Sequence, residues 1–79
     1  MSDWNEKTAV ITGAGSGIGS ALAQHCAAQG MHVIAADIDQ QGLRNTQSNA
    51  SKPEKIEIYT LDVRSENAVE SFAKHCFSQ

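Results

Sequence analysis

The feature that most constrains how this sequence folds is a cluster of glycines near its amino terminus. Four of its six glycines lie within residues 12–19, between an apolar run at residues 9–11 and a helix-like stretch at residues 20–24. A strand that turns sharply into a helix leaves unpaired N–H groups at the positive end of the helix dipole. Glycine permits such a turn and lets a phosphate approach the backbone closely. The cluster therefore predicts a binding site for an anion such as a pyrophosphate.

Apolar spacing along the chain predicts three β-strands that alternate with three α-helices. We expect the strands at about residues 7–12, 32–37 and 55–62. We expect the helices at about residues 18–29, 41–49 and 65–77, with Ser65 as the N-cap of the last. The second strand is apolar on four successive residues, which is typical of a parallel-sheet strand covered on both faces.

Two of the helices carry apolar residues at helical spacing, which predicts the faces that pack on the sheet. The first helix has Ile18, Leu22, Ala23, Cys26 and Ala27. The last helix has Val69, Phe72, Ala73 and Cys76. The middle helix offers little more than Leu43 for burial, so its prediction rests on the weakest pattern.

Strands joined by helices of this length imply right-handed crossovers and a parallel sheet with the strand order 3-2-1. The predicted fold class is therefore α/β, a Rossmann-type three-layer α/β/α arrangement that contains only part of a dinucleotide-binding sheet. With 79 residues, the chain can hold one small domain at most. Three strands in this order make up half of the sheet of such a domain.

Histidine and cysteine side chains suggest a metal cluster that the predicted topology argues against. Two His-Cys pairs lie at residues 25–26 and 75–76, on the first and last helices. These helices are expected on opposite faces of the sheet, which would keep the pairs apart. We expect His32 to have no special role at the start of its strand. Glu57, which alternates with isoleucines, is expected to mark a wetter face near a sheet edge.

Charge and composition exclude several classes of partner. The net charge is −3 and the isoelectric point is about 5.4, which provides no electrostatic footprint for nucleic acid or an acidic membrane. No apolar run approaches the roughly 20 residues of a membrane span. The polar start of the chain lacks the pattern of a secretory signal, and two cysteines suit reduced thiols better than a disulfide framework. We therefore expect a cytoplasmic protein.

The spacing of the glycines distinguishes between nucleotide-binding motifs. Gly-x-Gly-x-x-Gly does not fit in register, and no lysine follows the glycines as a P-loop requires. The sequence instead reads Thr-Gly-x-x-x-Gly-x-Gly through Thr12, Gly13, Gly17 and Gly19. This motif, near the amino terminus and between a strand and a helix, resembles that of the short-chain dehydrogenase/reductase family. The resemblance implies a dinucleotide cofactor held by the loop residues Gly13, Ser16, Gly17, Ile18 and Gly19.

Asp37 is the second candidate for cofactor binding. It ends the second strand, 18 residues after Gly19, near the spacing expected of an acid that binds the adenosine ribose. A carboxylate accepts from the ribose hydroxyls and repels a 2′-phosphate, which favours NAD(H) over NADP(H). Family members that use NADP(H) tend to carry a basic residue in the loop or just after this acid, where this chain has Ala14, Ser16 and Ile38. Asp39 is a rival for the role.

Asp62 and Val63 follow the third strand and resemble the acidic-apolar pair with which the family contacts adenine. The resemblance implies that the Asp62 carboxylate accepts from the adenine amino group and that Val63 packs on the ring. Together with Ile38 beside Asp37, these residues complete the predicted cofactor site.

The catalytic set of the family is not found in this sequence, so we assign no catalytic residue. Tyr59 is the only tyrosine, and Val63 stands where Tyr-x-x-x-Lys would need its lysine. The resemblance implies that residues 1–79 are the amino-terminal half of a nucleotide-binding domain, a fragment of a longer parent. That parent, expected to be a homo-oligomer, would transfer hydride between NAD(H) and a small-molecule alcohol or carbonyl substrate. The alternative is a non-catalytic, regulatory nucleotide-binding module of the same fold.

Overall fold

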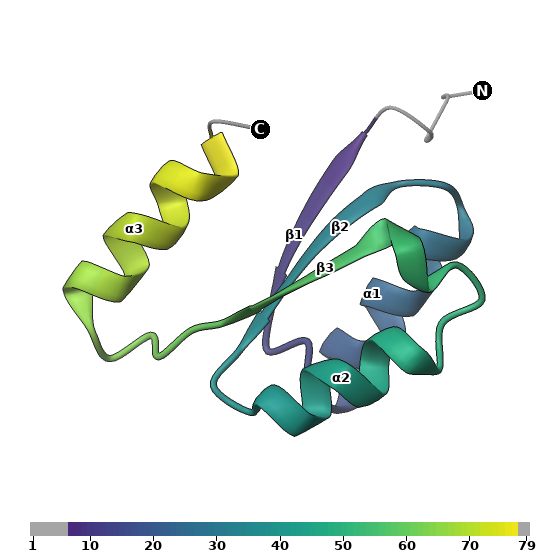
Figure 1. Cartoon of the computed structure of the whole chain (residues 1–79), viewed down its shortest axis with the longest axis horizontal. Helices are drawn as coiled ribbons and strands as arrows, with labels where there is room; N and C mark the ends of the chain where they lie inside the picture. The colour runs from purple at the N-terminus through teal and green to yellow at the C-terminus, as the bar shows by residue number, and fades with distance from the viewer. Residues whose placement is uncertain (1–6, 78–79) are drawn as a thin grey trace.

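The computed structural model describes residues 7–77, which form a parallel sheet with helices on both faces (Figure 1). The strands are β1 (Thr8–Thr12), β2 (His32–Asp37) and β3 (Ile56–Thr60), and the helices are α1 (Gly17–Ala28), α2 (Gln40–Ser48) and α3 (Glu66–Phe77). A short 3-10 turn, η1 (Pro53–Lys55), precedes β3. Every predicted element is present, with bounds that differ by a residue or two. Among the described helices, none has the length and apolar character needed to cross a membrane.

The polar start of the chain, whose sequence predicts no secretory signal, lies mostly outside the described residues.

The three described strands are all parallel and stand in the order β1-β2-β3, which confirms the predicted topology. Thr12 pairs with Ala36 near the ends of β1 and β2, and Asp37 pairs with Thr60 at the ends of β2 and β3. The segments that follow the three strands therefore meet at one edge of the sheet, where ligands bind in open α/β sheets.

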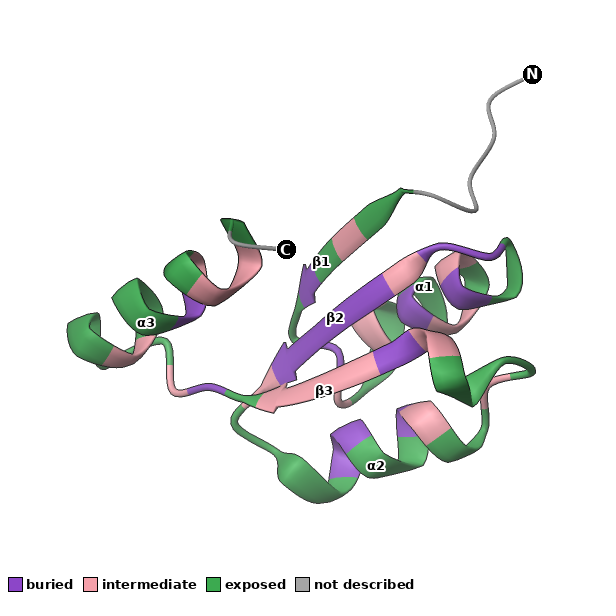
Figure 2. Ribbon diagram, turned by 45° about the horizontal axis from the view of Figure 1, so that its top comes forward, coloured by how far each residue is buried: buried purple, intermediate pink, exposed green. Residues whose placement is uncertain are grey.

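The central strand β2 is buried on both faces, as its unbroken apolar run predicts (Figure 2). Val33 and Ala35 belong to a core shared with α1 and α2. Ile34 and Ala36 belong to a second core, which Phe72 of α3 completes from the other side. The fold therefore has the three α/β/α layers, and the His-Cys pairs of α1 and α3 lie on opposite faces of the sheet.

The buried face of α1 is narrower than its apolar spacing predicts. Ala23 and Ala27, one turn apart, are fully buried against the sheet. Ile18 and Leu22 form the adjacent row and are 88% and 49% exposed, so the prediction that they pack in the core is wrong. The alanine row lets α1 approach the sheet closely, and the larger side chains point away from it.

The face that α3 buries is also rotated from the predicted one. Phe72 is buried, and Ala68 and Cys76, one turn on either side, pack with it. Val69 lies outside this i, i+4 row and is 39% exposed. Burial, followed by the negative charge of Glu57, raises the pKa of the Cys76 thiol above its ordinary value.

Glu57 lies on β3, which is an edge strand of the described sheet as its alternating sequence predicts, and its side chain is 34% exposed. Its Oε2 lies 2.5 Å from Nε2 of His75, and its Oε1 lies 3.4 Å from Nε2 of His32. His32, for which the sequence predicts no special role, thus takes part in a polar contact with Glu57. Glu57 joins the start of β2, the middle of β3 and the end of α3 into one polar contact.

Candidate functional site

The glycine loop turns sharply between β1 and α1 because two of its glycines adopt positive φ angles. Gly13 has φ +68° and Gly17 has φ +58°, conformations that residues with a Cβ rarely adopt. Gly19, in the first turn of α1, serves a different purpose. A Cβ at this position would overlap the carbonyl group of Gly13. The absence of a side chain at Gly19 therefore lets the start of α1 pack directly on the bend.

Three hydrogen bonds fix the loop to its neighbours. The Ala14 N–H donates to the Ala36 carbonyl of β2 at 3.1 Å. The Gly15 N–H donates to Oδ2 of Asp37 at 2.9 Å, and the Thr46 hydroxyl of α2 donates to the Ala14 carbonyl at 2.7 Å. The bend is thus held in a defined shape by β2 and α2 before any ligand is present.

Thr46 is a buried polar residue whose importance the sequence does not reveal. Its hydroxyl lies 2.7 Å from the Ser20 hydroxyl of α1 and 3.0 Å from the carbonyl of Gly42 in its own helix. Gly42 lies so close to the loop that a Cβ there would overlap the carbonyl of Gly15. Helix α2, which has the weakest sequence pattern of the three helices, therefore packs directly against the loop and stabilises its shape.

We expect Thr46→Val to destabilise the chain by about 1–3 kcal/mol, because it leaves the Ala14 carbonyl buried without its donor at nearly unchanged volume. Urea denaturation of the variant and the parent chain measures the difference. Ser48→Ala is the matched control, since the exposed Ser48 hydroxyl bonds only within α2. The control should stay within about 0.5 kcal/mol of the parent. A Thr46 variant as stable as the Ser48 variant would contradict the supporting role.

The positive end of α1 is left open. Its N-cap, Ser16, makes no side-chain capping bond, and the first turn contains no acidic residue. The other two described helices differ, because Asp39 caps α2 through the Gly42 N–H and Ser65 caps α3 as predicted, through the Ala68 N–H. The amides of the first turn of α1 are therefore available to an anion.

Asp37 extends from the end of β2 toward the loop. Oδ2 of its carboxylate accepts from Gly15, and Oδ1 accepts from the Asp39 N–H at 3.0 Å. Hydrogen bonds from the backbone of Asp39, and then of Gly15, hold the pKa of Asp37 below its ordinary value. A carboxylate has about four acceptor positions, so Asp37 keeps acceptor capacity beyond the hydrogen bonds from Gly15 and Asp39. This capacity suits a hydroxyl-bearing ligand, whereas the rival Asp39 uses its side chain to cap α2.

The lowered pKa of Asp37 predicts a pH dependence of folding stability. Its stabilising contribution is present above the unfolded pKa, near 3.8, and is lost as the pH falls through the lower folded pKa. Urea denaturation between about pH 2 and about pH 7 should show this loss in the parent chain, and a smaller loss in Asp37→Asn. Equal acid-side losses in the two proteins would contradict it.

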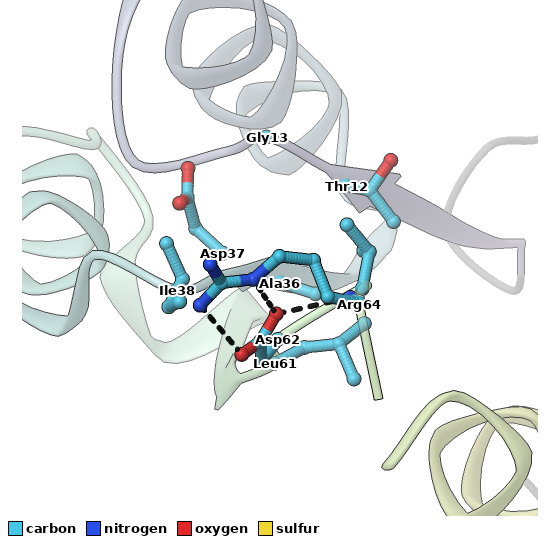
Figure 3. Close-up of a pocket in the computed structure, with 9 residues that line it drawn as sticks. Thr12, Gly13, Ala36, Asp37, Ile38, Leu61, Asp62 and Arg64 are labelled. Carbon is cyan, nitrogen blue, oxygen red and sulfur yellow. Dashed lines mark hydrogen bonds and ion pairs between the residues drawn. The ribbon is translucent and has the colours of Figure 1, made fainter. Parts of the chain in front are cut away.

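A cleft of about 440 Å³ opens at the carboxyl edge of the sheet (Figure 3). Its lining includes five of the predicted site residues: Gly13, Asp37, Ile38, Asp62 and Val63. The other four predicted residues do not line it: Ser16, Gly17, Ile18 and Gly19. They form the bend and the start of α1, and they follow the lining residue Gly13 in the sequence. The lining also contains four residues that we did not predict as site residues: Thr12, Ala36, Leu61 and Arg64.

Asp62 and Arg64 form an ion pair on the β3 side of the cleft (Figure 3). The Arg64 guanidinium, and then the Arg64 backbone N–H, hold the pKa of Asp62 below its ordinary value. Ile38 and Val63 also line the cleft and are 56% and 68% exposed. The lining of the cleft thus combines two carboxylates, of Asp37 and Asp62, with exposed apolar side chains, which suits a polar ligand that carries a flat ring.

Comparisons with known proteins identify relatives of this chain. The sequence profile of a family described as short chain dehydrogenase matches residues 7–79. YxbG from Bacillus subtilis, described as an uncharacterized oxidoreductase, is 42% identical over 74 residues, which are 92% of this chain and 27% of YxbG. The chain therefore spans about a quarter of the length of this curated relative.

Solved structures share the fold. A short chain dehydrogenase/reductase from Burkholderia phymatum, in complex with NAD, is 34% identical with a TM-score of 0.77; the match covers 95% of this chain and 27% of that one. A metagenomic short-chain oxidoreductase, in complex with NADP, is 26% identical with a TM-score of 0.77; the match covers 91% of this chain and 33% of that one.

Proposed function

We propose, because this chain belongs to the short-chain dehydrogenase family, that it binds the adenosine and pyrophosphate portions of NAD(H) at the carboxyl edge of its sheet. The observation that carries this proposal is the pairing of two features. An uncapped helix start lies at a glycine bend, and the carboxylate of Asp37 is hydrogen-bonded to that bend. The first feature suits a pyrophosphate and the second suits the adenosine ribose next to it.

The residues of the site fit this ligand. The first-turn amides of α1, at Gly17, Ile18 and Gly19, would donate to the pyrophosphate, with the Ser16 hydroxyl beside them. The free acceptor positions of Asp37 would receive the two ribose hydroxyls. Gly13 would leave room for the ligand at the bend, where no neighbouring atom lies within 4 Å of a Cβ built on it.

The choice of NAD(H) over NADP(H) rests on Asp37. Solved relatives include one complex with NAD and one with NADP, so family membership alone leaves the choice open. A 2′-phosphate would have to approach the Asp37 carboxylate, which is ionised at neutral pH. The repulsion between these like charges favours the unphosphorylated cofactor.

The adenine ring would lie between Ile38 and Val63, the exposed apolar side chains of the cleft, with Asp62 at its amino group. We propose that this chain is the amino-terminal half of a nucleotide-binding domain in a longer oxidoreductase, expected to be cytoplasmic and homo-oligomeric. When bound there, NAD(H) would supply the hydride chemistry toward a small alcohol or carbonyl substrate. The residues of this segment hold the cofactor, and we propose no catalytic role for them.

Calorimetric titration of the chain with NAD and with NADP tests the proposal. We expect measurable binding of NAD and binding of NADP that is at least about tenfold weaker, because one hydrogen-bonded charge contributes roughly that much. Equal or tighter binding of NADP would refute the role of Asp37. No binding of either dinucleotide would refute the proposal as a whole.

A further inference from the structure

Arg64 is the only cation among the residues that line the described cleft. Its side chain folds back onto Asp62 and donates hydrogen bonds to both carboxylate oxygens (Figure 3). Nε lies 3.0 Å from Oδ1 and Nη2 lies 3.0 Å from Oδ2. The Arg64 backbone N–H adds a third hydrogen bond, to Oδ1 at 2.9 Å. The Asp62 carboxylate is therefore fixed in rotation by three donors from one residue.

These donors leave the two carboxylate oxygens unequal. An ionised carboxylate offers about two acceptor positions on each oxygen. Oδ1 uses both, for Nε and for the backbone N–H, whereas Oδ2 uses one, for Nη2. A ligand in the cleft thus meets Asp62 as a single acceptor with a set direction, at Oδ2.

This pair contributes little to folding. The Arg64 side chain is 81% exposed and the Asp62 side chain is 37% exposed, and ion pairs between exposed groups add little to stability. The forked guanidinium nevertheless imposes a geometry on a carboxylate that a simple point charge would not impose. The ordering of Asp62 therefore suits recognition of a ligand better than support of the fold.

We propose that Arg64 is a positioning residue that aims Oδ2 of Asp62 at the exocyclic amino group of the purine, so that the cleft selects adenine. This inference rests on the function proposed above. A purine with a carbonyl group at that position would place its carbonyl oxygen against Oδ2 of Asp62. Both oxygens are hydrogen-bond acceptors, so this purine would bind more weakly. Arg64 acts through Asp62 and need not touch the base itself.

The test compares NAD with nicotinamide hypoxanthine dinucleotide, which has a carbonyl group in place of the adenine amino group. Both are titrated into the parent chain, Arg64→Ala, Arg64→Lys and the control Arg44→Ala, which removes an exposed cation of α2 outside the cleft. We expect the parent and the control to prefer NAD by about tenfold. In Arg64→Ala this preference should fall to about twofold, and Arg64→Lys, which lacks the fork, should lose most of it. Thermal melts of all four proteins should coincide.

The ratio of the two affinities separates this role from others. If Arg64 only attracts the pyrophosphate or stacks on the ring, both ligands weaken equally and the ratio stays at the parent value, which would overturn the inference. Full preference in Arg64→Lys would overturn it as well, because charge alone would then suffice. If the parent chain binds NAD without preferring it, the inference fails while the proposed function stands. If it binds neither dinucleotide, both fail.

Discussion

Gly19→Ala is expected to abolish dinucleotide binding and to destabilise the chain by about 3 kcal/mol. The new methyl group would overlap the Gly13 carbonyl, which belongs to the backbone, so no side-chain rotation can relieve the clash. Either the first turn of α1 unwinds or the bend shifts away from it, and in both cases the open amides lose their arrangement. Urea denaturation and NAD titration of the same sample measure the two effects. For a chain of this size the loss is a large share of an expected stability of about 4–12 kcal/mol.

Ala21→Leu is the control for this prediction. Ala21 lies on α1 near Gly19 but is exposed, so a larger side chain there meets no backbone. We expect its stability and NAD affinity to match those of the parent chain within about 0.5 kcal/mol. If Gly19→Ala behaved like this control, the close packing of α1 on the bend would have no part in the site.

Asp37→Asn is expected to weaken NAD binding by at least about tenfold and to reduce the preference for NAD over NADP by a similar factor. In the parent chain both carboxylate oxygens accept hydrogen bonds from backbone N–H groups. The amide of the variant retains one acceptor oxygen, but its NH2 group would face one of these N–H donors and could not accept from it. It also removes the negative charge that would oppose a 2′-phosphate. Titration with both cofactors measures the two effects, and their ratio separates charge repulsion from general damage to the site.

Asp39→Asn supplies the matched control, because it changes the rival acid in the same way only two residues away. Asn caps helices about as well as Asp, so α2 should keep its start. We expect this variant to bind both cofactors like the parent chain. A change of preference in Asp39→Asn, with none in Asp37→Asn, would reverse the roles of the two acids.

The sequence predicted those parts of the fold that depend on local pattern. The glycine spacing predicted the bend, and the unbroken apolar run of β2 predicted a strand buried on both faces. Ser65 was recognisable as an N-cap because capping joins residues three apart. The position of Asp37 at the end of a central strand placed it at the carboxyl edge of the sheet, where the cleft lies.

The features that could not be predicted depend on contacts between distant residues. Thr46 donates to Ala14 across 32 positions of sequence, and no periodicity marks a threonine in a polar helix as a support. Glu57 and His75 are 18 positions apart and meet only because side chains of α3 pack against β3. Arg64 lies only two residues after Asp62, so its proximity was visible, but the forked contact depends on how the chain turns after β3.

The exposed Ile18 shows a different limit. Helical spacing identifies an apolar stripe but not which row within it faces the sheet. In α1 the alanine row takes that place, because small side chains allow the close approach that the bend at Gly13 and Gly19 requires.

The most direct test of the cofactor site is a crystal structure of this chain grown with NAD. We expect the pyrophosphate against the first-turn amides of α1, and both adenosine ribose hydroxyls within hydrogen-bonding distance of the Asp37 carboxylate. A dinucleotide bound elsewhere, with the glycine bend vacant and Asp37 directed into solvent, would contradict the account.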